Sequence, residues 1–193
     1  MHFLPDYPLE TARLLLRPFV RGDVDAVHAY RSREDVTRFM FDAPLSREAC
    51  AEAVQLRVGQ VAWSEECEKI FLAVERREDN AMIGEVLLIL RDAASAQAEL
   101  GYTFHPDFHG RGYATEASAR LLALAFDDAA MHRVYARCHA DNIASRRVME
   151  RLGMRQEAHF REHRLVKGAW DSELLLAILE DEWRAGPHAA PPH

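Results

Sequence analysis

The chain has 193 residues, of which 49% are hydrophobic and 28% are charged. This composition is typical of a folded globular protein and excludes a disordered or fibrous chain. The 31 acidic and 24 basic residues give a formal net charge of -7, so the overall field repels phosphate backbones and argues against nucleic acid as the main ligand.

The sequence predicts neither a membrane span nor an exported protein. No apolar run approaches the ~20 residues that a span needs, and the first residues lack the basic and apolar regions of a secretory signal. Cys50, Cys67 and Cys138 are odd in number and form no Cys-x-x-Cys pair, which indicates reduced thiols rather than disulfides or a zinc ribbon. We therefore expect a cytoplasmic protein.

The first half of the chain predicts a strand, two helices and an antiparallel meander. Arginines lie among leucines at residues 12–20, which indicates a strand, and Asp23 can cap a helix that ends near Arg31. A second helix is expected at residues 46–63. Apolar runs separated by polar turns then predict three strands at residues 70–74, 82–90 and 97–104.

The residues after Pro106 predict a helix that faces the core. Its apolar residues recur at three- and four-residue intervals: Ala114, Ala117, Leu121, Leu122, Leu124, Ala125 and Phe126. A strand is expected next, at residues 134–139. Because a strand–helix–strand connection is right-handed, this strand should lie parallel to the strand at residues 97–104.

The end of the chain predicts one more helix and a hairpin. Asp141 or Asn142 caps the helix, which runs to Arg151, and Gly153 stops it. Strands at residues 156–165 and 172–179 follow, joined by a turn at Lys167-Gly168. We expect an α+β fold in a single domain of residues 1–183, with residues 184–193 as a disordered tail.

Two glycines lie at the junction between strand 97–104 and the next helix. Gly110 and Gly112 have no Cβ, so the backbone can turn tightly and present its N–H groups to a phosphate at the helix N-terminus. Glycines before helices are also common turn residues. A P-loop is excluded because Tyr113 and Ala114 follow the last glycine, and Thr115 stands where a dinucleotide fingerprint needs glycine or alanine.

Three short runs occur in order along the second half of the chain. The first is His109-x-x-Gly112-x-Ala114, the second is Asn142-x-x-Ser-x-x-x-x-Glu-x-Leu-Gly, and the third covers residues 168–174. Together they resemble the GNAT superfamily of N-acetyltransferases, whose first signature usually begins with Gln or Arg instead of His109. The third run is similar to the Rim-type branch, which includes ribosomal-protein N-terminal acetyltransferases. The resemblance extends from about residue 14 to residue 179.

This resemblance implies the GNAT fold, with a mixed and strongly twisted sheet, and acetyl-CoA as co-substrate. It also implies that the glycine turn binds the pyrophosphate through backbone N–H groups, and that strand 97–104 splays from its neighbour to pair with the pantetheine arm. Asn142 and Ser145 are then expected near the thiol. The implied coenzyme-binding residues are Tyr102, Thr103, Phe104, His109, Gly110, Arg111, Gly112, Tyr113, Ala114, Thr115, Asn142 and Ser145.

Acetyl transfer needs a neutral amine and a proton donor for the departing thiolate. Glu99 matches the strand glutamate of Rim-type relatives and is the candidate base, directly or through water; the alternative is a surface carboxylate. Ser145 is the candidate proton donor. The alternative is that its hydroxyl only hydrogen-bonds to the backbone of its own helix. Many GNAT enzymes use a tyrosine at the position of Met149, so here Ser145, Tyr102 or water remains.

Five other residues are expected near this predicted site. Glu85 follows Gly84 and can assist acceptor binding, although an exposed strand position is the stronger expectation. Cys138 has no partnered base, so we expect a buried core thiol rather than a nucleophile. Arg146, Arg147 and Arg151 can contact the 3′-phosphate of the coenzyme or form a solvated helix face.

No metal site is expected. His159 and His163 are four residues apart, which spans about 13 Å on a strand, and this is too far for one ion. His105 and His109 have the same spacing but flank Pro106 in a loop.

The expected function is direct transfer of acetyl from acetyl-CoA to a primary amine in a ternary complex. The Rim-type resemblance favours a protein N-terminal amine, whereas the acidic balance also suits a polyamine, an aminoglycoside or another small cationic amine. The alternative from another class is a non-catalytic acyl-CoA-binding regulatory module. Relatives often dimerise, which makes a homodimer a further expectation.

Overall fold

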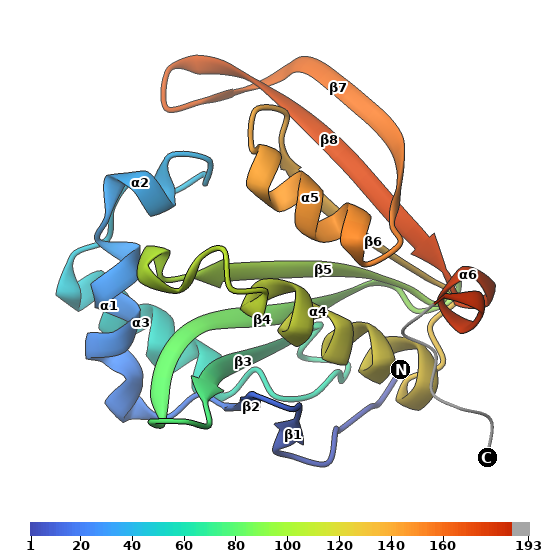
Figure 1. Cartoon of the computed structure of the whole chain (residues 1–193), viewed down its shortest axis with the longest axis horizontal. Helices are drawn as coiled ribbons and strands as arrows, with labels where there is room; N and C mark the ends of the chain where they lie inside the picture. Colours follow the sequence, from blue (N-terminus) through green and yellow to red (C-terminus); the bar gives the residue numbers. More distant parts are fainter. Residues whose placement is uncertain (187–193) are drawn as a thin grey trace.

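The structure is a computed structural model that describes residues 1–186 (Figure 1). One eight-stranded sheet has the order β1-β2-β3-β4-β5-β6-β8-β7. Its strands are β1 (Leu9–Glu10), β2 (Leu14–Pro18), β3 (Lys69–Arg76), β4 (Ala81–Asp92), β5 (Gln97–Phe104), β6 (Arg133–His139), β7 (Arg155–Val166) and β8 (Ala169–Leu179). The helices are η1 (Arg21–Asp23), α1 (Val24–Arg31), α2 (Glu34–Thr37), α3 (Arg47–Val58), η2 (Pro106–Phe108), α4 (Tyr113–Ala123), the π-helical turn η3 (Leu124–Asp128), α5 (Ile143–Arg151) and α6 (Glu180–Ala185).

The sheet is mixed, which confirms the predicted α+β class. Neighbouring strands are antiparallel except for β5 and β6, which are parallel and are connected through α4 and η3. The two strands pair only at Gln97↔Arg133, Ala98↔Val134 and Glu99↔Tyr135. Beyond Glu99 they diverge, so the backbone edge of β5 is free from Leu100 onward.

Side chains alternate along each strand, so the sheet has two distinct faces. One face carries the main core and packs against α4 and α5; its buried residues include Leu72, Val86, Leu88, Ala98, Leu100, Ala117, Leu121, Val134, Met149, Leu174 and Leu176. The other face is covered by α1 and α3, whose smaller apolar cluster contains Val27, Tyr30, Cys50 and Val54. Figure 1 shows these helices gathered at the end of the sheet away from the β7–β8 hairpin.

A buried ion pair joins the second face to its helices. Glu85 of β4 accepts hydrogen bonds from Arg57 (3.0 Å) and Tyr30 (3.1 Å). The Glu85 side chain is only 2% exposed, so the expectation of an exposed strand position was wrong. Glu85 is buried because helices α3 and α1, which are distant in the sequence, cover this strand and supply its two partners.

Predicted boundaries also differ from the structure, as two examples show. The helix predicted at residues 46–63 ends at Val58, because the chain turns at Gly59 and Val61 and Trp63 form bridges with Ile70 and Phe3. At the other end, α6 continues to Ala185, so the first two residues of the predicted tail are helical. Residues 187–193 lie outside the described part of the chain.

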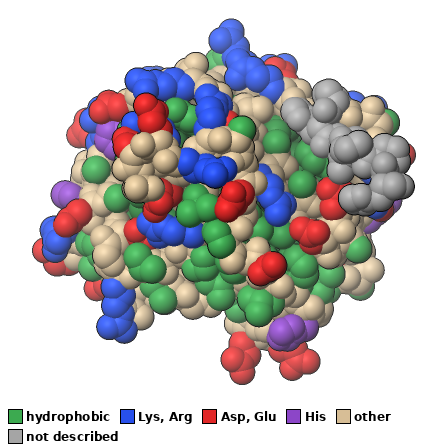
Figure 2. Space-filling model, turned by 60° about the horizontal axis from the view of Figure 1, so that its bottom comes forward, with side chains coloured by type: hydrophobic (Ala, Val, Ile, Leu, Met, Phe, Trp, Pro, Cys, Tyr) green, Lys and Arg blue, Asp and Glu red, His purple; other side chains and the backbone are tan. Residues whose placement is uncertain are grey.

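Surface charge is mixed on the face that Figure 2 shows. Acidic and basic side chains are interspersed there, with hydrophobic side chains between them. In the described part of the chain, no helix combines the length and apolar character that a membrane crossing requires.

Candidate active site

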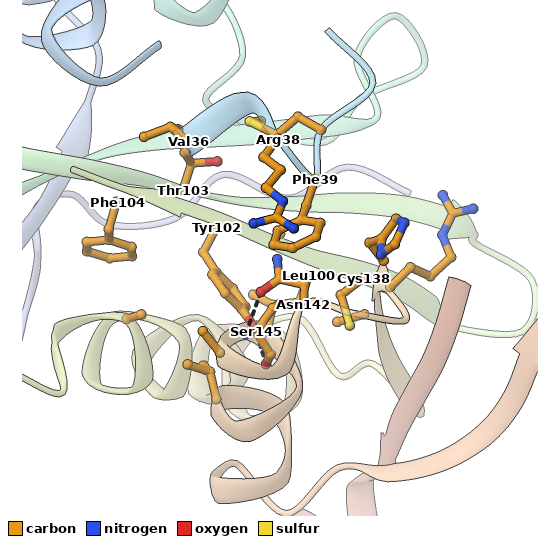
Figure 3. A pocket seen from close by; sticks show the side chains of 18 of the residues that line it. Val36, Arg38, Phe39, Leu100, Tyr102, Thr103, Phe104, Cys138, Asn142 and Ser145 are labelled. Atoms are coloured by element: carbon orange, nitrogen blue, oxygen red, sulfur yellow. Dashed lines mark hydrogen bonds between the residues drawn. The ribbon is translucent and has the colours of Figure 1, made fainter. Parts of the chain in front are cut away.

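A cavity of about 740 Å³ opens where β5 and β6 diverge. Residues from both faces of the sheet line it, because the gap between the strands connects the two sides (Figure 3). On one side lie the glycine turn, the start of α4 and α5; we call this the coenzyme half. On the other side lie the segment of residues 35–42 and charged side chains of β5, β6, β7 and β8; we call this the acceptor half.

The glycine turn has the geometry of an anion site. Gly110 and Gly112 have φ angles of 74° and 80°, a region that L side chains rarely adopt. Gly112 is the N-cap of α4 and offers no side-chain cap. The first N–H groups of α4 therefore face outward without an acceptor in the helix, and the helix dipole adds positive potential there.

Neighbouring side chains hold this turn in place. The Nε2 of His109 lies 2.9 Å from the carbonyl oxygen of Phe104 and ties the turn to the end of β5. Arg13 donates to the carbonyl of Arg111 (3.0 Å) and pairs with Glu116 of α4. The Thr115 hydroxyl is buried without a hydrogen-bond partner among the described residues. A phosphate oxygen at the start of α4 would supply the partner that Thr115 lacks.

Tyr102 and Ser145 meet at the centre of the cavity (Figure 3). The Tyr102 hydroxyl lies 2.9 Å from both the Oγ and the carbonyl oxygen of Ser145. Asn142 is the N-cap of α5 and accepts a hydrogen bond from the Ser145 N–H (3.1 Å). Burial raises the pKa of Tyr102 well above its usual value, so the phenol keeps its proton at neutral pH.

Cys138 lies beside this pair but is a poor nucleophile. Its residue is 8% exposed, and burial raises the pKa of its thiol to about 11, against the opposing effect of a hydrogen bond with Ser145. Because the thiolate is the reactive form, Cys138 is inert at neutral pH. The prediction of a buried core thiol is confirmed.

Glu99 lies in the acceptor half, where β5 leaves β6. Arg91 donates to its Oε2 at 2.7 Å, and Arg137 donates to Oε1 at 3.0 Å and to Oε2 at 3.3 Å. Both oxygens are therefore engaged. The structure places Glu99 at the cavity, held between two guanidinium groups.

A second group of carboxylates in the acceptor half comes from β8. Glu173 is 1% exposed and Asp171 is 7% exposed, and Arg164 of β7 binds both. The Oε1 of Glu173 has no hydrogen-bond partner among the described residues, although Arg137 Nε lies 3.3 Å away from it. Glu173 was not among the predicted site residues; the signals that could have identified it are its charge inside an apolar strand sequence and its place in the run of residues 168–174.

Three of the histidines that are four residues apart in the sequence have separate partners in the structure. His109 contacts Phe104, and His105 caps η2 through the N–H of Asp107. His163 is near Glu173 and Asp171, and ligand atoms of these three residues lie within 4.8 Å of one another. Arg164 already supplies the positive charge between the two carboxylates.

The structure brings most of the predicted coenzyme residues to one cavity. The lining includes the predicted residues Tyr102, Thr103, Phe104, His109, Gly110, Gly112, Tyr113, Ala114, Thr115, Asn142 and Ser145. Arg111 does not line the cavity; its guanidinium lies over the Phe108 ring. Arg147 and Arg151 line the coenzyme half, whereas Arg146 pairs with Glu150 on the surface.

Comparisons with known proteins agree with this geometry. Residues 13–155 match the family model described as an acetyltransferase (GNAT) domain. An uncharacterized N-acetyltransferase of Bacillus subtilis, YnaD, is 32% identical over 175 residues, which cover 91% of this chain and 98% of that protein. A spermidine N(1)-acetyltransferase of Vibrio cholerae is 24% identical over 172 residues, covering 89% and 96% of the two chains.

A solved structure extends this agreement to three dimensions. The GNAT-family acetyltransferase of Bacillus anthracis superposes with a TM-score of 0.80 at 28% identity, over 91% of this chain and 99% of that one. The matched range includes the glycine turn and the two diverging strands that line the cavity. The chain belongs to the GNAT family of N-acetyltransferases and is an acetyl-CoA-dependent acyltransferase.

Proposed function

We propose that the chain transfers acetyl from acetyl-CoA to a primary amine by direct attack in a ternary complex, with a peptide or protein N-terminal α-amine as the favoured acceptor. The observation that carries the proposal is the Tyr102–Ser145 hydrogen bond at the divergence of β5 and β6. It offers a protonated donor at the centre of the cavity. The neighbouring Cys138 thiol is not activated, which supports direct transfer over an acetyl-cysteine intermediate.

The coenzyme half has the donors that acetyl-CoA requires, and acetyl-CoA supplies the thioester. The free N–H groups at the start of α4 and the Thr115 hydroxyl would bind the pyrophosphate. The unpaired edge of β5 at residues 102–104 would pair with the amide groups of the pantetheine arm. Asn142 and Ser145 would then lie at the thiol end.

Two proton movements follow from the arrangement of the side chains. Ser145 donates its proton to the departing thiolate and regains one through Tyr102, whose hydroxyl is within hydrogen-bond distance and which takes a proton from solvent in the same relay. Glu99 accepts the proton of the attacking amine through water, because arginines engage both of its oxygens directly. The amine nitrogen forms a bond to the acetyl carbon, and the carbon–sulfur bond breaks.

The cost of deprotonating the acceptor favours an α-amine. An α-amino group with a pKa of ~8 costs about 1 kcal/mol to deprotonate at pH 7, whereas a lysine side chain near ~10.4 costs roughly 4.6 kcal/mol. Both Glu99 oxygens are engaged by arginines, so the proton would reach Glu99 only through water, which suits the less demanding reaction. A small cationic amine is the second candidate, supported by the relative that is named for spermidine. The three free cysteines suit a reducing, cytoplasmic setting.

Matched peptides test this proposal. The full-length protein is incubated with acetyl-CoA and a lysine-containing peptide whose N-terminus is either free or blocked, and the products are located by tandem mass spectrometry. The proposal predicts acetylation at the free N-terminus and no product from the blocked peptide. Acetylation of the lysine in both peptides would contradict the α-amine assignment, and coenzyme binding without any product would favour the regulatory module.

A further inference from the structure

The acidic residues that line the cavity all have arginine partners already. Near the entrance, Arg33 binds Asp35 and Arg31 binds Asp42. Deeper in the cavity, Arg91 and Arg137 bind Glu99. Arg164 binds both Asp171 and Glu173, and Arg137 also contacts Glu173. A polycationic acceptor would have to displace these guanidinium groups, several of which contact carboxylates that are almost fully buried. Each of these carboxylates therefore already has a positively charged partner among the described residues.

Arg38 is the exception among the arginines of the acceptor half. Arg137 and Arg164 are paired with carboxylates, but Arg38 has no carboxylate within ion-pair distance in the part of the chain that the structure describes. Its guanidinium lies 5.0 Å from the ring centroid of its neighbour Phe39. Figure 3 shows the side chain extending from the segment after α2 into the cavity, toward the side where Tyr102 and Asn142 lie.

The segment that carries Arg38 is fixed over the acceptor half from both sides. The Phe39 ring lies 5.1 Å from the His139 ring, and the Phe41 ring lies 4.0 Å from the Arg164 guanidinium. Lys167 of the β7–β8 turn donates to the carbonyl of Thr37 (2.7 Å). Arg38 is thus placed above the entrance by which an acceptor reaches the divergence of β5 and β6.

From this charge arrangement we infer that the acceptor carries a carboxylate near its reactive amine, and that Arg38 binds that carboxylate. A guanidinium matches a carboxylate with two parallel hydrogen bonds, which makes the contact strong and directional. The acceptor class is an amino acid or a peptide with an acidic residue close to its N-terminus, not a polyamine. This inference rests on the proposed acetyl transfer and names its substrate class.

Three peptide amides provide the test: Ala-Asp-Phe-amide, Ala-Asn-Phe-amide and Ala-Lys-Phe-amide, with spermidine as a fourth acceptor. Thiol release is measured with the full-length enzyme at saturating acetyl-CoA. We expect kcat/KM for the Asp peptide to exceed that for the Asn and Lys peptides by about tenfold or more, as the loss of one charge-assisted contact predicts. Spermidine should be the poorest acceptor.

Variants assign the preference to Arg38. In Arg38→Gln the preference for the Asp peptide should disappear, with an unchanged KM for acetyl-CoA, and Arg38→Lys should retain part of it. Arg47→Gln is the control, because Arg47 pairs with Asp25 on the surface and neither residue lines the cavity. The Asp peptide is also titrated by calorimetry into each enzyme saturated with CoA, where no turnover occurs. Its affinity should be highest for the unchanged enzyme, lower for Arg38→Lys and lowest for Arg38→Gln.

Each other outcome overturns the inference in a recognisable way. Equal use of the three peptides, or a preference for the Lys peptide or spermidine, leaves the proposed transfer standing but removes the carboxylate acceptor. A raised KM for acetyl-CoA in Arg38→Gln, equal for all acceptors, would assign Arg38 to the coenzyme. Transfer to none of the four acceptors, with acetyl-CoA bound, would contradict the proposed function and this inference together.

Discussion

At the residue scale, the coenzyme half depends on backbone conformation more than on side-chain chemistry. Gly110 and Gly112 allow the positive φ angles of the turn, and Gly112 leaves the start of α4 uncapped. This feature was predictable from sequence because glycine has a local conformational meaning. The Phe104 contact of His109 was not predictable, since the sequence does not show where the His109 ring points.

Substitution of Gly112 by valine should abolish acetyl-CoA binding. A β-branched residue at a φ of 80° is strained, and its side chain would stand in the approach to the N–H groups of α4. We expect no binding heat in a calorimetric titration at an acetyl-CoA concentration that saturates the unchanged protein. Gly22→Ala is the control, because no atom lies within 4 Å of its added Cβ and its φ is not positive. Unchanged affinity in Gly112→Val would remove the turn from the binding site.

Substitution of Glu99 by glutamine should lower turnover and leave coenzyme affinity intact. The amide cannot accept a proton, and general base contributions are typically about 10²-fold or more. The measurement is kcat at saturating substrates together with the dissociation constant for acetyl-CoA. Glu52→Gln, an exposed position on α3, serves as the control. Full activity of Glu99→Gln across the pH range would show that the carboxylate only positions Arg91 and Arg137.

At the element scale, the divergence of β5 and β6 creates the site. The bounds of β5 could be predicted from sequence, since the apolar run between two polar turns is a local pattern. The burial of Glu85 and the pairing of Glu173 could not, because Arg57, Arg137 and Arg164 reach these carboxylates only in the folded chain. Tertiary contacts of Val61 and Trp63 likewise explain why α3 ends at Val58, before the end that its own sequence predicts.

Helices α1 and α3 are held to the sheet by the buried pair of Glu85 and Arg57. Replacing Glu85 with alanine leaves the Arg57 charge buried and unpaired, so we expect a loss of about 3–5 kcal/mol in the free energy of unfolding. Denaturant titration measures this loss. The double variant Glu85→Ala with Arg57→Met should recover part of the stability, and a loss below about 1 kcal/mol in the single variant would show that the pair is dispensable.

At the scale of the whole molecule, the coenzyme half and the acceptor half of the cavity lie on the two faces of the sheet. The core face carries α4, α5 and the glycine turn. The acceptor half combines the other face with the segment after α2. The two halves meet at the Tyr102–Ser145 hydrogen bond. This division explains how one cavity can hold both substrates at once, as direct transfer requires.

The most direct test of this account is the amine-dependent release of free CoA thiol from acetyl-CoA by the purified full-length chain, followed with a thiol reagent. The account predicts steady release that requires both the protein and an amine acceptor, and that is lost in Gly112→Val. An absence of release with every acceptor class, from a protein that binds acetyl-CoA, would contradict the assignment of the cavity as the site of acetyl transfer.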